Sequence, residues 1–211
     1  MDRSFFLKNS ARLEYFTIAW NVIAAITGFA TGISAGSIAL AGFGLDNAVA
    51  IAPTSVLLWR LRVAADERHG EFTYSQVARR ALFVAGVAYF LLSLYLLNES
   101  ASRLSYQWKA DVTVSGLVLA VLSVFILPLL ALLKFRAATM LGRRIIRVNA
   151  RKTLVCGYLS LILLVGLGCN AWLGWWWADP VAVLLMVPLI ARKGWRAVEE
   201  SKGTPSLEAK K

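Results

Sequence analysis

Six long runs of apolar residues dominate the 211-residue chain, and polar residues gather between them. The runs cover residues 14–34, 38–59, 77–98, 112–133, 150–171 and 178–198. A helix needs about 20 mostly apolar residues to cross a hydrocarbon layer of ~30 Å, and each run has about that length. The runs exceed the ~9–11 residues of a barrel strand and lack its alternation. The pattern therefore predicts an all-α polytopic membrane protein with six transmembrane helices.

Composition narrows the class further. Hydrophobic residues make up 58% of the chain and charged residues 17%, whereas soluble domains have about 45–50% and roughly 25%. The mean hydropathy of +0.63 excludes disorder, and it excludes a soluble nucleic-acid binder as the explanation of the net charge of +11. One His and two Cys exclude a zinc-finger cluster and a disulfide framework.

The basic residues predict the orientation in the membrane. Of 23 Lys and Arg, all but Arg103 and Lys109 fall before the first run, after the even-numbered runs or near the C-terminus. Cytoplasmic segments carry the excess of Lys and Arg, so both termini are expected in the cytoplasm. The predicted organisation is a cytoplasmic tail over residues 1–13, a membrane domain over 14–198 and a short disordered cytoplasmic tail over 199–211. We expect a multi-pass protein of the cell membrane.

Two further patterns concern packing. Gly28, Gly32 and Gly36 recur every four residues, which lets another helix approach closely. That helix belongs either to the same chain, which we favour, or to a second copy in a homodimer. Four tryptophans are expected to form an interfacial aromatic belt at the non-cytoplasmic side: Trp172, Trp175, Trp176 and Trp177.

Asp46 is the most informative single residue, because it lies in the middle of the second run. A carboxylate there costs about 2.5–3.5 kcal/mol on insertion scales, so we expect it to face the bundle interior with a partner or an ion. Pro53 follows and frees a backbone carbonyl about one turn earlier. The residue is either a protonated or Arg-paired structural group, or an ion or proton site.

A second polar stripe opens the fifth run. Asn149, Thr153, Cys156 and Ser160 lie within about 60° of one another on a helix. Together with Asp46, they predict a mixed oxygen and sulfur cation site. Lys152 argues against a metal there if its side chain lies at the site, because an ammonium repels a divalent ion. The alternative is that the Lys152 side chain extends to the cytoplasmic surface.

Catalytic constellations are missing from the sequence, so we do not expect an enzyme. There is no Ser-His-Asp set, phosphate-cradling glycine loop or pair of catalytic carboxylates. His69, Glu71 and Tyr74 share one cytoplasmic connection, where a lone His is expected to be solvated.

Three segments resemble the membrane domain of the cation diffusion facilitators, or cation efflux proteins. They are SIALAGFGLDNAVAIAP…LLWRLR, NARKTLVCGYLS and WLGWWWADPVAVLLMVPLIARKGWRAV. The resemblance covers nearly all of residues 13–198 and is greatest for the short branch that is similar to small zinc-associated transmembrane proteins. Its most recognisable element, W-x-D-P, corresponds to Trp177, Asp179 and Pro180. We interpret Asp179 as a residue of the helix N-terminus rather than a ligand.

The resemblance implies a zinc-type site built from two acids in the second span and a His-x-x-x-Asp pair in the fifth. These positions hold Asp46, Ala50, Lys152 and Cys156 in this chain, and Asn149 replaces a common carboxylate. Asp46, Cys156 and Asn149 are thus the predicted metal ligands. No resident cofactor is predicted, and a divalent cation such as Zn²⁺ is the expected transported ion.

The function implied is exchange of a divalent cation for protons by alternating access around Asp46. The alternative is a non-transporting interaction or regulatory subunit derived from the same fold. The expected partners are the lipid bilayer, the cation and protons, and a bacterial plasma membrane is the expected location.

Overall fold

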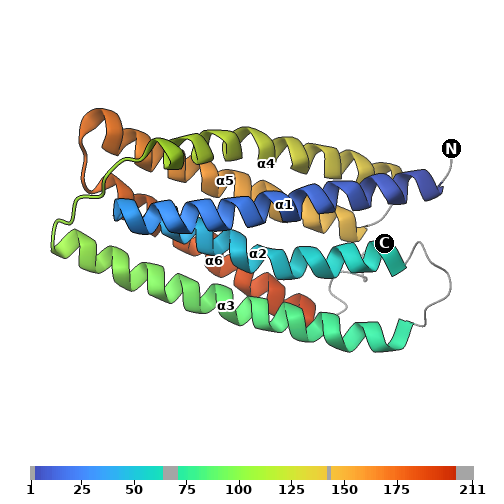
Figure 1. Ribbon diagram of the computed structural model, residues 1–211. Coiled ribbons are helices and arrows are strands. Elements are labelled where there is room, and N and C mark those ends of the chain that lie inside the picture. Colours follow the sequence, from blue (N-terminus) through green and yellow to red (C-terminus); the bar gives the residue numbers. More distant parts are fainter. Residues whose placement is uncertain (1–2, 64–70, 142–143, 203–211) are drawn as a thin grey trace.

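The computed structural model describes residues 3–63, 71–141 and 144–202, and it is helical almost throughout these ranges (Figure 1). The six helices are α1 (Arg3–Ala35), α2 (Ile38–Val63), α3 (Glu71–Ser105), α4 (Val114–Leu141), α5 (Arg144–Leu173) and α6 (Ala178–Ser201). Because their number is even, the start of α1 and the end of α6 lie at the same side of the bundle. His69 lies outside the described residues, as do the side chains of Glu71 and Tyr74.

Five of the helices, α1 to α5, carry stretches long and apolar enough to cross a membrane. The sixth helix, α6, is less apolar because it carries Asp179 near its start and Arg192, Lys193 and Arg196 in its second half. It nevertheless runs along α3 through the depth of the bundle. The prediction of an all-helical polytopic membrane protein is confirmed.

Several helices extend beyond the apolar runs that predicted them. α1 begins at Arg3, inside the segment expected to be a tail, and α6 continues to Ser201. α5 begins at Arg144 rather than at residue 150. Helix ends depend on backbone hydrogen bonds and capping groups, whereas hydropathy marks only the part that lies in hydrocarbon.

The helices pack as pairs: α1 with α2, α3 with α6 and α4 with α5. The glycine stripe of α1 forms the first of these contacts. A methyl group added at Gly32 would lie 2.4 Å from the Ala41 backbone nitrogen, and one at Gly28 would lie 3.1 Å from Gly44 Cα. The small residues therefore pack against a neighbour in the same chain, as favoured from the sequence.

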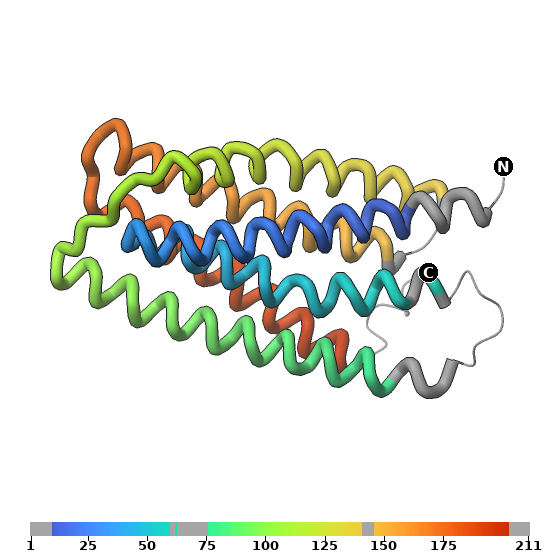
Figure 2. The backbone as a smooth tube through the Cα atoms, in the orientation of Figure 1, coloured from blue at the N-terminus to red at the C-terminus, as the bar shows by residue number. Residues whose placement is uncertain are grey.

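At the end opposite the start of α1, the α1–α2 and α5–α6 connections are short and the α3–α4 connection is longer (Figure 2). Gly36 and Gly174 adopt positive φ values of 62° and 65° in the α1–α2 and α5–α6 turns, a conformation that glycine adopts without strain. The α3–α4 connection lies against the first of these turns, where Asp111 N donates to Ala35 O. Trp175 and Trp177 stack on each other at this end and are both exposed, and the aromatic belt stays a prediction.

Asp179 lies at the N-terminus of α6, as predicted, but its carboxylate contacts a different helix. It is buried in the first turn of α6, yet its carboxylate accepts hydrogen bonds from Ser37 Oγ at 2.5 Å and Ile38 N at 2.9 Å. These groups lie at the start of α2, so Asp179 caps the N-terminus of α2 rather than its own helix. The interaction ties α6 to α2 at the end of the bundle opposite the start of α1.

Candidate functional site

Asp46 is completely buried in the middle of α2, and its charge has a partner. Both carboxylate oxygens accept a hydrogen bond from the Lys193 Nζ of α6, each at 2.7 Å. The Lys193 side chain is itself only 9% exposed. The sequence left open whether Asp46 is a protonated group, an Arg-paired group or an ion site. In this conformation Asp46 is paired, and its partner is a lysine rather than an arginine.

The Lys193 ammonium also lies against two other helices. Its Nζ donates to Cys156 Sγ on α5 at 3.2 Å, and it lies 5.2 Å from the centre of the Tyr89 ring on α3. A cation over an aromatic ring is attracted by the electron-rich face. Four helices thus contribute a carboxylate, an ammonium, a sulfur and an aromatic ring to one cluster, which we call the Asp46 cluster.

Asp46 and Cys156 meet because α5 starts early. From hydropathy alone, Cys156 lies too near the cytoplasmic end of its span to reach the depth of Asp46. The start at Arg144 moves the whole segment deeper, since each residue adds about 1.5 Å of helix. Two of the three predicted ligands, Asp46 and Cys156, therefore share one neighbour, the Lys193 ammonium.

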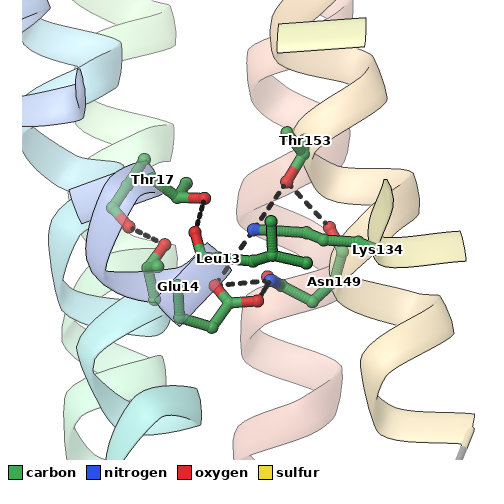
Figure 3. Close-up of polar contacts among 8 residues, drawn as sticks. Leu13, Glu14, Thr17, Lys134, Asn149 and Thr153 are labelled. Atoms are coloured by element: carbon green, nitrogen blue, oxygen red, sulfur yellow. Dashed lines mark hydrogen bonds and ion pairs between the residues drawn. The ribbon is translucent and has the colours of Figure 1, made fainter. Parts of the chain in front are cut away.

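Asn149 belongs to a second cluster, shown in Figure 3. Its Nδ2 donates to both carboxylate oxygens of Glu14, at 2.8 and 3.0 Å. Lys134 Nζ lies 3.0 Å from Glu14 Oε2 and 3.2 Å from Thr153 Oγ1. Glu14, Lys134, Asn149 and Thr153, together the Glu14 cluster, join α1, α4 and α5 in the interior of the bundle.

The predicted ligands are therefore divided between two clusters. Asp46 and Cys156 lie together, and Asn149 binds Glu14 instead. Glu14, Thr17 and Asn21 share one face of α1 by their i, i+3 and i+7 spacing, and this polar face is the signal in the sequence for the second cluster. The sequence does not single out Lys134 and Lys193, because the charge pattern groups them with the basic residues outside the apolar runs, whereas in the structure both are buried.

Lys152 does not enter either cluster. Its Nζ lies 2.6 Å from Glu200 Oε2 near the end of α6, and both side chains remain partly exposed at 24% and 19%. The Lys152 side chain therefore turns toward the end of the bundle where α6 ends and away from the Asp46 cluster.

The donors available for a metal are few. The described residues contain no group of three or more His, Cys, Asp and Glu side chains close enough to hold one ion. A zinc site normally has four ligands, or three and a water, so Asp46 and Cys156 supply half of a set. The charge between them is a protein ammonium, held in an interior of low dielectric constant where such pairs interact strongly.

A cavity of about 100 Å³ adjoins the Asp46 cluster. The lining of the cavity includes Ala50, Tyr89, Cys156 and Lys193, and Lys152 lines it as well. Ala50 stands where the resemblance places a second acid, so the missing carboxylate leaves open space rather than packed side chains.

Ionisable groups paired inside a helical membrane bundle are costly and are typical of proteins that bind or move ions. The fold and the two clusters place the chain in this class of polytopic membrane protein. A family model described as the cation efflux transmembrane domain matches residues 15–203. The chain belongs to the cation efflux family.

Individual relatives of known name have low sequence identity to this chain. A cadmium, cobalt and zinc/H(+)-K(+) antiporter of Bacillus velezensis is 25% identical over 196 residues, covering 87% of this chain and 59% of the relative. The antiporter of the same name from Bacillus subtilis is 25% identical over 195 residues, covering 87% and 60%. Transmembrane protein 163 of Xenopus laevis is 25% identical over 158 residues, covering 75% and 54%. The chain thus spans little more than half the length of these relatives.

Proposed function

We propose that this chain moves a divalent cation of the zinc, cadmium or cobalt type across a membrane in exchange for protons, with Asp46 as the cation-binding carboxylate. One observation carries the proposal: a cation, the Lys193 ammonium, already lies on both oxygens of Asp46 and against the Cys156 sulfur. The geometry therefore supports cation binding at this point. The names of the two bacillary relatives supply the class of ion and the exchanged proton.

Lys193 is then an internal competitor for the transported ion. Its long flexible side chain can withdraw its ammonium into the adjoining cavity, which its own side chain lines. A divalent cation arriving at Asp46 would find one carboxylate, one sulfur and water. A sulfur ligand favours softer ions such as zinc over magnesium or calcium.

Flux into proteoliposomes tests the proposal, with a zinc-sensitive dye inside and a pH gradient imposed or omitted. We expect Asp46→Asn to lower zinc flux at least tenfold, because the neutral amide does not replace the charged ligand. Asp111→Asn, an equivalent change at an exposed residue of the α3–α4 connection, is the control and should leave flux unchanged.

Asp46→Asn also leaves the Lys193 ammonium without its carboxylate, so folding must be separated from function. The double variant Asp46→Asn/Lys193→Met removes both charges and is expected to be monodisperse yet inactive. Lys193→Met alone should bind zinc more tightly than the wild-type chain, because the competitor is gone. Equal zinc flux in the wild type and a folded Asp46→Asn variant would overturn the proposal.

A non-transporting membrane subunit is the second candidate, and the Asp46–Lys193 ion pair favours it. If the ammonium never leaves Asp46, the cluster is a structural contact between α2 and α6. The expected result is then no binding of Zn²⁺, Mn²⁺ or Co²⁺ at micromolar concentration, together with a stable membrane partner in pull-down experiments. The relatives from Bacillus make a bacterial plasma membrane the proposed location.

A further inference from the structure

The cavity beside the Asp46 cluster has an unexpected charge for a protein of this family. Four basic side chains line it: Lys152, Arg192, Lys193 and Arg196. All the residues of the lining lie in the described ranges, and none of them is acidic. A cavity lined in this way attracts anions and repels the approach of a divalent cation.

Two of the four charges are already balanced. Lys193 is paired with Asp46, and Lys152 with Glu200. In the part of the chain that the structure describes, neither Arg192 nor Arg196 forms an ion pair or a side-chain hydrogen bond. The cavity therefore has an excess of two positive charges, both from arginines one turn apart on α6.

A neutral donor faces the same space from the opposite helix. Asn21 of α1 lines the cavity and is only 3% exposed. Its NH₂ group can donate two hydrogen bonds to an oxygen acceptor.

Planar guanidinium groups are matched to oxyanions. Each arginine can donate two parallel hydrogen bonds to a phosphate or carboxylate group, and such bonds are shorter and stronger than neutral ones. A volume of about 100 Å³ admits a small group of this kind rather than a large metabolite. We propose that this cavity binds a phosphate group, held by Arg192 and Arg196 from α6 and by Asn21 from α1. The group belongs either to free inorganic phosphate or to the headgroup of a phospholipid.

The site has a consequence for the route to Asp46. A bound phosphate would neutralise the two arginines and so reduce the repulsion that a cation meets in the cavity. The phosphate site does not depend on cation transport, because its binding is measured without any divalent ion. Failure of the proposed transport function would leave the phosphate site intact, and the reverse also holds.

Calorimetry with the full chain in phosphatidylcholine nanodiscs tests the proposal, with inorganic phosphate as the probe. We expect saturable binding that weakens at least tenfold in the double variant Arg192→Gln/Arg196→Gln. The double variant Arg192→Lys/Arg196→Lys keeps the positive charges but loses the planar guanidinium groups. Its phosphate affinity should therefore lie between those of the wild type and of Arg192→Gln/Arg196→Gln. Arg151→Gln, at an exposed residue of α5 outside the cavity, is the control and should bind as the wild type does.

A second arm identifies the source of the phosphate group. Nanodiscs containing phosphatidylglycerol are analysed by native mass spectrometry for retained lipid, with and without added phosphate. Retained lipid that is lost in Arg192→Gln/Arg196→Gln identifies a headgroup as the ligand, and calorimetric binding in its absence identifies free phosphate. Phosphate affinity and lipid retention that are the same in the double variant and in Arg151→Gln, or absent from the wild type, would overturn the proposal.

Discussion

The Asp46–Lys193 ion pair should contribute strongly to folding, and its strength can be measured by a double-mutant cycle. The two charges lie 2.7 Å apart with exposed fractions of 0% and 9%. At an effective dielectric constant of about 20, their Coulomb attraction is about 6 kcal/mol before desolvation is subtracted. Removing one partner of such a pair costs about 3–5 kcal/mol, because the other charge remains buried.

We therefore expect Asp46→Asn and Lys193→Met each to lower the free energy of unfolding by about 3–5 kcal/mol. The double variant should lose no more than either single one, which corresponds to a coupling energy of about 3 kcal/mol or more. The assay is reversible denaturation in mixed micelles, followed by the fluorescence of the eight tryptophans.

A control cycle on the Glu99–Arg103 pair of α3 separates burial from pairing. This pair is formed at 3.0 Å but is partly exposed, so its coupling should be about 0.3–0.5 kcal/mol. A coupling energy at Asp46 and Lys193 as small as that of the control would refute the reasoning, since it would mean that the ammonium is not buried against the carboxylate.

Three further changes test other parts of the structure. Gly32→Ala should destabilise the bundle by about 2 kcal/mol or more, because the new methyl group would lie 2.4 Å from a backbone nitrogen of α2. Gly168→Ala is the control, since its methyl group meets nothing within 4 Å. Thermal unfolding of the two variants measures the difference. Glu14→Gln should cost about 3–5 kcal/mol in the denaturation assay by leaving its partner ammonium buried, while Glu99→Gln costs about 0.5 kcal/mol or less. Asp179→Ala should lower stability by about 1–2 kcal/mol and speed amide exchange in the first turn of α2, and unchanged exchange there would contradict the cap.

The helical membrane fold follows from the apolar runs, because backbone groups in hydrocarbon must be satisfied within each segment. Asp46 could be singled out for the same reason, since a charge at that depth requires a partner. The identity of the partner depends on how α6 is rotated and how far it extends, and hydropathy constrains neither. Lys193 and Arg192 are adjacent basic residues that the sequence pattern does not distinguish. In the structure the Lys193 side chain is buried, whereas Arg192 is exposed.

The division of the predicted ligands has a comparable cause. Asn149 and Cys156 lie on the same stripe of α5, but they are seven residues, or about 10 Å, apart along the helix axis. Each therefore meets a different helix: Asn149 reaches α1 through Glu14, and Cys156 reaches α6 through Lys193. Periodicity identifies residues that share a face, whereas their depth relative to other helices depends on tertiary packing.

The pairing of the helices determines where the bundle can open. Contacts such as that between α1 and α2 depend on close fit of small residues, and any displacement there loses dispersion energy with nothing to replace it. The buried charges instead join helices of different pairs, α2 to α6 and α1 to α4. Under the proposed transport function, an arriving ion or proton would replace a charged partner, and these contacts between helices would be the ones that separate. The bundle thus has two kinds of helix contact. One depends on the close packing of small residues, and the other depends on buried ion pairs, whose strength changes with the charge of the groups.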